Sequence, residues 1–148
     1  MSNEEYLGMI EKLNLLINNK ILEKEELFTI ATKTTQENDG MPHASGTSDK
    51  VGNGTVKILE KESEIDRVID LFYDLKQEII GQIQKLPADE YDVLHKSFVQ
   101  GMSIATIAEE KGKHFDTIKS IRRKGIRNVR ILESKNLKDA RKMLFDVV

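Results

Sequence analysis

A dense run of cations marks residues 111–130 of a chain that is slightly acidic as a whole. Eight Lys and Arg side chains fall within these twenty residues, opposed only by Asp116, whereas the full chain has 23 Lys+Arg against 25 Asp+Glu. Ammonium and guanidinium groups neutralise phosphates, and they also hydrogen-bond the edges of bases. The segment therefore predicts contact with a nucleic acid, the alternative being a solvated, charged helix face.

The small and apolar residues around this run have the spacing of a helix-turn-helix. With Ala108 where the two helices cross closely, Gly112 falls four residues later, where the turn needs a residue that tolerates a positive φ. Isoleucines follow ten and thirteen residues after Ala108, on the inward face of the second helix. Ser103 is placed to cap the first helix. The inward residues of this motif are Ile104, Ile107, Ala108, Ile118 and Ile121.

This register turns the polar side chains of the second helix, which begins near residue 115, outward. The N-terminal part of such a helix meets base edges in the major groove, and cations elsewhere contact phosphates. For Phe115 we favour folding back onto the core over contact with a thymine methyl group. The candidates for base contact are His114, Phe115, Asp116, Lys119, Ser120 and Arg123. The candidates for phosphate contact are Lys113, Arg122, Lys124, Arg127 and Arg130.

The string "LPADEYDVLHKSFVQGMSIATIAEEKGKHFDTIKSIRRKGIRNVR", residues 86–130, resembles region 4 of sigma-70-type factors. Two positions depart from that pattern. His114 stands where region 4 usually has a helix-capping Ser. Gly125 costs the second helix about 1 kcal/mol relative to Ala, which predicts a bend or an end of the helix there. The matching positions are Leu86-Pro87, Val93-Leu94, Gly101-Met102-Ser103, Ile107-Ala108, Gly112 and Thr117-Ile118.

The first part of the chain, "YLGMIEKLNLLINNKILEKEELFTIATKTT", is similar to small phage and prophage proteins of Gram-positive bacteria. These are related to the RinA and ArpU types of late-gene regulator. The resemblance implies a sequence-specific transcriptional regulator, with double-stranded DNA as its partner, RNA polymerase as a second partner, and no enzymatic activity. One alternative is a protein-interaction module that binds polymerase or another phage protein without sequence-specific DNA binding. A weaker alternative is a DNA-recognition component of phage packaging.

Two apolar stripes predict an antiparallel helical hairpin over residues 1–86. Their steps of three and four residues are the rhythm of a coiled coil, and neither helix can bury its stripe alone. We favour a core role for both stripes over a homodimer interface. Residues 32–55 between them hold few apolar side chains and predict a flexible loop. The stripes are Tyr6, Ile10, Leu13, Ile17, Ile21, Leu27, Phe28 and Ala31, and Ile58, Ile65, Val68, Phe72, Leu75, Ile79, Ile83 and Leu86.

The rest of the chain also predicts helices, and no segment alternates as a strand would. Pro87 suits the start of a helix that ends near Gly101. Residues 133–148 predict an amphipathic tail helix, for which we favour covering the domain over docking to a partner. The expected fold is therefore all-α, with a hairpin at 1–86, a helix-turn-helix DNA-binding domain at 87–132 and the tail at 133–148.

Composition narrows the function further. The chain has no Cys, its three His show no ligand spacing, and no Ser/His/Asp arrangement stands out, so we expect no metal, no cofactor and no enzyme. Residues 1–86 carry 10 basic and 16 acidic residues, and 87–148 carry 13 and 9, which indicates two parts with different partners. The acidic first residues are unlike a signal peptide, and no apolar run reaches the length of a membrane span. We expect a protein of the bacterial host cytoplasm without membrane contact.

Overall fold

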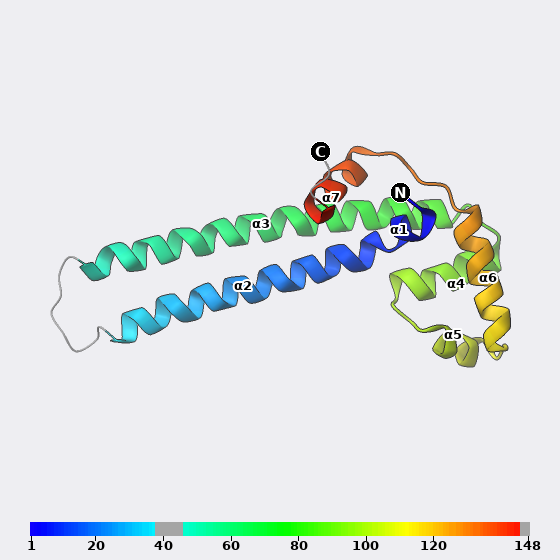
Figure 1. The fold of residues 1–148 in the computed structure, drawn as a ribbon, viewed down its shortest axis with the longest axis horizontal. Coiled ribbons are helices and arrows are strands. Elements are labelled where there is room, and N and C mark those ends of the chain that lie inside the picture. Colours follow the sequence, from blue (N-terminus) through cyan, green and yellow to red (C-terminus); the bar gives the residue numbers. More distant parts are fainter. Residues whose placement is uncertain (38–45, 146–148) are drawn as a thin grey trace. The chain divides into compact units, whose positions relative to one another are not determined.

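The described part of the chain consists of helices and connecting segments without a strand, which confirms the all-α prediction (Figure 1). This computed structural model describes the backbone of residues 1–37 and 46–145, and the side chains of residues 1–30 and 54–145. No helix in these ranges is long and apolar enough to cross a membrane. The elements are α1 (Asn3–Leu7), α2 (Met9–Glu37), α3 (Gly46–Ile83), α4 (Ala88–Leu94), the π-helical segment η1 (His95–Val99), α5 (Ile104–Lys111), α6 (Phe115–Asn128) and α7 (Lys135–Phe145).

The predicted hairpin is confirmed, because α2 and α3 pack antiparallel. The predicted loop 32–55, however, overlaps both helices: α2 continues to Glu37 and α3 begins at Gly46. Extending an existing helix end needs no new nucleation, so a helix can continue into a polar segment. Residues 38–45, the remainder of that predicted loop, lie outside the described residues.

Contacts divide the chain into two compact units, which we call the head unit (residues 1–14 and 71–148) and the arm unit (residues 15–70). The hairpin contributes its two ends to the head unit, where Leu75, Ile79 and Ile83 of α3 are fully buried. The compact units therefore do not follow the expected border between residues 86 and 87. The three segments expected from the sequence stay a prediction about function.

The arm unit buries little apolar surface. Of its apolar stripe, Ile17, Ile65 and Val68 are buried, whereas Phe28 is 61% exposed. Ion pairs connect its two helices: Lys20 Nζ lies 3.1 Å from Glu64 Oε2, and Lys61 Nζ lies 2.7 Å from Glu23 Oε2. The two helices of the arm unit are therefore held together by a narrow strip of buried apolar side chains with ion pairs beside it.

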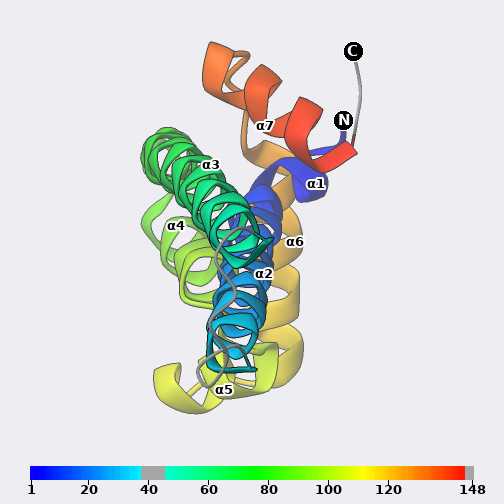
Figure 2. The ribbon, with the colours of Figure 1, turned by 90° about the vertical axis from the view of Figure 1, so that its left-hand side faces the viewer.

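In the head unit, α7 lies beside α1 and α3 (Figure 2). Leu137 and Ala140 on its inner face are fully buried. Glu78 of α3 accepts hydrogen bonds from Ser134 Oγ at 2.6 Å and Asn136 Nδ2 at 2.8 Å, at the start of α7. The ammonium of Lys12 lies 4.4 Å from the centre of the Phe145 ring. These contacts give α7 the covering position that we favoured.

Candidate nucleic-acid interface

The predicted helix-turn-helix core is present in α5 and α6. Ile107 and Ile118 are fully buried, and they cluster with Ala108 and with Val93 of α4. Ile104 and Ile121 are partly buried against this cluster, as the spacing predicts. Gly112 ends α5 with φ of 62°, the left-handed conformation that favours glycine. The turn and the inward face of α6 thus follow the sequence pattern.

The two helices start differently. Ser103 caps α5, because its hydroxyl accepts a hydrogen bond from the Thr106 N–H at 3.2 Å. Helix α6 begins at Phe115, as predicted, but its N-cap residue His114 makes no capping hydrogen bond with its side chain. The first N–H groups of α6 therefore keep their capacity to bind an anion such as a phosphate.

Gly125 does not end α6, because the helix continues to Asn128. Its backbone instead approaches α4 closely: a Cβ atom at this position would lie 2.9 Å from Cδ1 of Leu94, which is fully buried. Glycine here costs the helix some conformational entropy and permits the close crossing that seats α6 on α4. The structure gives the departure from the region 4 pattern a packing reason.

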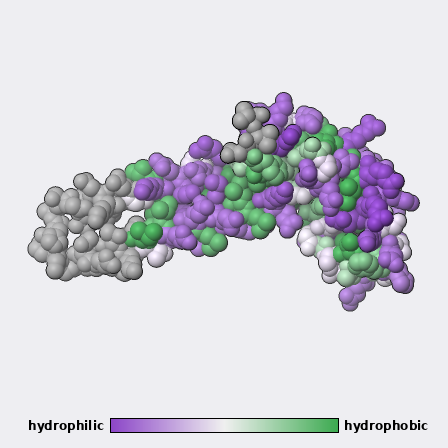
Figure 3. Space-filling view, in the orientation of Figure 1, coloured by the Kyte–Doolittle hydropathy of each residue, from purple (hydrophilic) through white to green (hydrophobic). Residues whose placement is uncertain are grey.

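The base-contact candidates all lie on the exposed face of α6 or at its start. His114, Asp116, Lys119, Ser120 and Arg123 are exposed. Phe115 is 46% exposed, so it does not fold back onto the core as we favoured. Hydrophilic residues cover the visible surface over α6 (Figure 3). This face is free of other described elements and available to a partner.

Among the phosphate candidates, Arg122 differs from the rest. Lys113, Lys124, Arg127 and Arg130 are exposed. Arg122 is directed into the head unit by the three contacts that follow. Its Nε donates to Ser97 Oγ at 3.0 Å, its guanidinium carbon lies 4.7 Å from the Phe98 ring centre, and Nη2 lies 3.8 Å from Glu4 Oε1. Arg122 therefore anchors α6 to η1 and α1, and these contacts hold its guanidinium away from the exposed face of α6.

The end of α6 is held by the start of the chain. Asn3 Nδ2 donates to the carbonyl oxygens of Ile126 at 2.8 Å and Val129 at 2.9 Å. The last carbonyls of a helix lack partners within it, so this side chain acts as a cap. Sequence reasoning missed this role, since Asn3 stands more than a hundred residues before the helix it caps.

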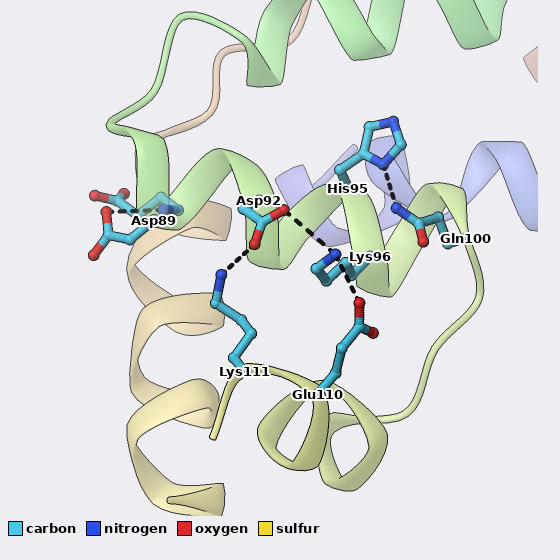
Figure 4. A network of polar contacts seen from close by, with 8 residues as sticks. Asp89, Asp92, His95, Lys96, Gln100, Glu110 and Lys111 are labelled. Carbon is cyan, nitrogen blue, oxygen red and sulfur yellow. Dashed lines mark hydrogen bonds and ion pairs between the residues drawn. The ribbon is translucent and has the colours of Figure 1, made fainter. Parts of the chain in front are cut away.

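A polar network connects α4 and η1 to α5 (Figure 4). Asp92 accepts a hydrogen bond from Lys111, and Lys96 lies 3.6 Å from Asp92 Oδ1 and 3.4 Å from Glu110 Oε1. The hydrogen bond from Lys111 is the main reason that the pKa of Asp92 is lowered. Lys111, the first cation of the basic run, therefore supports the fold.

His95 lies at the edge of this network, where α4 passes into η1. Gln100 Nε2 is 2.9 Å from His95 Nδ1, and burial lowers the pKa of this histidine. Within the described residues, no group of three His, Asp or Glu side chains is arranged to hold a metal ion.

Comparisons with known proteins identify no relative from which a role for these residues could be inferred. No family model, no curated protein and no solved structure matches this chain. The resemblance of residues 86–130 to region 4 therefore stays a prediction from the sequence.

Proposed function

We propose that this chain is a phage or prophage transcriptional regulator that binds specific double-stranded DNA through its helix-turn-helix. In this proposal α6 lies in the major groove, with Lys119 and Arg123 toward base edges and Lys124 and Arg127 toward phosphates. The resemblance to region 4 favours a promoter-region target and contact with RNA polymerase, and the resemblance to RinA and ArpU types favours late-gene activation.

One observation carries the proposal: four of the five cations of α6 stay exposed and without an ion pair among the described residues, although acidic side chains are plentiful elsewhere in the chain. These four are Lys119, Arg123, Lys124 and Arg127. Of the eight cations at 111–130, only Lys111 and Arg122 make ion pairs among the described residues. The arm unit, in contrast, pairs Lys20, Lys24 and Lys61 with glutamates. Cations that served only solubility would not need to lie together, without acidic partners, on one face of a helix. A DNA-binding face does need such an excess of positive charge.

The test is binding to the DNA upstream of the chain's own gene, measured over a range of salt concentrations. If three to five phosphates are neutralised, the plot of log affinity against log salt has a slope of roughly −3 to −4. Arg123→Ala is expected to cost roughly 1–3 kcal/mol at the specific site and to change the preferred sequence. The matched variant Arg127→Ala is expected to weaken all sequences alike and to make the slope shallower by about 0.9.

The alternative of a protein-interaction module makes the opposite prediction. It requires that no fragment be preferred over random DNA at physiological salt and that Arg123→Ala retain function in cells. Phage packaging, the weaker alternative, predicts preferred binding near terminase genes and not at a promoter.

We also propose that the arm unit supports a homodimer. Leu15, Leu22 and Leu59 are each more than half exposed there, and burying a side chain of this size contributes about 1.5–3 kcal/mol. Leu22→Glu should convert a dimer to a monomer in analytical ultracentrifugation while leaving the helix content unchanged. A dimer that survives Leu22→Glu and Leu59→Glu together contradicts this assignment.

A further inference from the structure

A second cluster of basic and amide side chains lies outside the exposed face of α6. The C-terminal ends of α3 and α6, both within the head unit, lie close together (Figure 1). A cleft of about 320 Å³ opens between residues of these two ends. A water molecule occupies about 30 Å³ in the liquid, so the cleft admits a tetrahedral oxyanion with part of its hydration shell. It is lined by Gln82, Lys85, Leu86, Asn128 and Arg130.

The cleft concentrates hydrogen-bond donors that have no acceptor. Lys85 and Arg130 are exposed, and neither makes an ion pair with any described residue. Gln82 is only 8% exposed, and its side-chain amide makes no hydrogen bond to the described part of the chain. The amide atoms of Gln82 themselves remain accessible to solvent in the cleft, so its N–H groups can donate to a ligand there. The donors fit an anion.

The walls of the cleft are fixed by the fold. Val129, next to Arg130, is 3% exposed, and its carbonyl oxygen accepts the hydrogen bond from Asn3. Ile83, next to Gln82, is fully buried. Lys85 and Arg130 therefore project from held backbones, which lowers the entropy cost of bringing two cations to one ligand.

One acidic group stands close to the cleft. Glu90 accepts a hydrogen bond from Asn128 Nδ2 at 2.9 Å and is 8% exposed. Glu90 does not line the cleft, but it engages the Asn128 amide nitrogen. This carboxylate and the last carbonyls of α3 and α6 oppose an anion, so binding in the cleft depends on both Lys85 and Arg130.

We infer that this cleft binds a phosphate group of the DNA backbone, gripped between Lys85 and Arg130 with the Gln82 amide as a third donor. The inference rests on the proposed DNA-binding function and extends that interface from α6 to the end of α3. A contact at the C-terminal end of a recognition helix suits phosphates, because the base edges are met by the helix start. Lys85 was not among the candidates from the sequence.

Two measurements on the full chain test the inference. The first is a titration with inorganic phosphate, followed by the ¹H–¹⁵N signals of the Gln82 side-chain amide, with sodium chloride at equal ionic strength as the reference. The second is the salt dependence of DNA binding for Lys85→Ala, Arg130→Ala and the double variant. Lys135→Ala is the matched control, because Lys135 is an exposed, unpaired lysine on α7 of the same unit.

We expect phosphate to shift the Gln82 amide signal in the wild type and not in Lys85→Ala. We expect each single variant to make the salt slope shallower by about 0.9, and the double variant by no more, because both cations serve one phosphate. Lys135→Ala should leave both readouts unchanged.

Three outcomes overturn parts of this picture separately. An unmoved Gln82 signal rejects the anion site. A moved signal with an unchanged DNA slope in Lys85→Ala assigns the cleft to free phosphate and rejects the DNA contact. A moved signal in a wild-type chain that binds no DNA at all rejects the proposed function and leaves the anion site standing.

Discussion

The head unit and the arm unit contain the same two helices, yet they are stabilised differently. Of the twenty buried apolar residues among those described, seventeen belong to the head unit and three to the arm unit. Helices α2 and α3 carry apolar stripes along their length, but only the ends of these stripes are covered by further helices. The periodicity of the apolar residues therefore predicts which side chains face a neighbouring helix. Whether those side chains are also buried depends on a third element that covers them.

The arm relies on contacts that contribute little to stability. Exposed ion pairs such as Lys61–Glu23 stabilise a fold little, because water and salt screen the attraction between the two charges. A unit with so few buried apolar side chains opens at lower free energy than one with a covered core. We therefore expect the arm to open before the head, and the predictions below test that difference.

The largest expected effect comes from one substitution made in both units. Leu75→Ala in the head removes a fully buried side chain and should lower the free energy of unfolding by about 2–5 kcal/mol, as measured by urea denaturation. Leu59→Ala in the arm, where the side chain is 57% exposed in the single chain, should change the free energy of unfolding of the monomer by less than about 0.5 kcal/mol, measured at a protein concentration too low for dimers to form. Equal losses at the two positions would show that the arm holds a core of its own.

Substitutions of two glycines in the head unit, Gly81 and Gly125, test the effects of helix propensity and of packing separately. A Cβ atom at Gly81 of α3 would have no neighbour within 4 Å, so Gly81→Ala should stabilise by about 0.4–1 kcal/mol. Gly125→Ala pushes against the buried Leu94 and should cost about 1–3 kcal/mol of overpacking, which exceeds that gain. Thermal unfolding of both variants measures the difference. Stabilisation by Gly125→Ala would mean that Leu94 moves aside without cost.

The cap at the end of α6 gives a smaller effect. Asn3→Ala removes the hydrogen bonds to Ile126 and Val129 and should lower stability by about 1 kcal/mol. Asn19→Ala on the exposed face of the arm is the control, and it should be neutral or slightly stabilising because alanine favours helix. Chemical denaturation compares the two variants. The same loss in both would assign the effect to composition and not to the cap.

The smallest effect concerns pH. The folded pKa of Asp92 is lowered, chiefly by the hydrogen bond from Lys111, so its contribution is present above the usual carboxyl pKa of about 4 and is lost as pH falls through the lowered value. Asp92→Asn should cost less than about 1 kcal/mol at pH 7 and should remove that part of the acid dependence. Denaturation at pH 7 and pH 3 tests this. A variant with the wild-type loss on acidification would place the dependence elsewhere, for example at Glu23 and Glu64, whose pKa values are also lowered by lysines.

Local rules predicted what depends on neighbours in sequence. The positive φ of Gly112, the Ser103 cap and the buried Ile118 follow from spacing within the motif. The antiparallel hairpin follows from two stripes joined by a polar segment. Asp116, Lys119, Ser120 and Arg123 of α6 are exposed because Ile118 and Ile121 take the inward face of the helix, as the spacing predicts.

What the sequence did not reveal depends on distant residues. In the sequence Arg122 is one cation of the basic run, and only the fold places Ser97 and Phe98 beside it. Gly125 looks like a helix breaker in the sequence, and only the fold places Leu94 opposite it. Lys85 is an ordinary helix-end lysine until the fold brings Arg130 to the same cleft. Each of these roles depends on contacts between residues far apart in the sequence, so no local sequence pattern predicts it.

The cap of α6 by Asn3 also bears on the order of folding. The hydrogen bond joins residues 123 positions apart, so it closes one of the longest loops that this chain can form. Such contacts form late in folding, because the entropy cost of closing the loop falls once local helices and the α2–α3 pairing have shortened the path between its ends. Asn3→Ala should therefore leave the refolding rate nearly unchanged and accelerate unfolding, with a φ-value near zero in stopped-flow experiments. Asn3, although synthesised before α6, would therefore be among the last residues to fix the end of this helix in place.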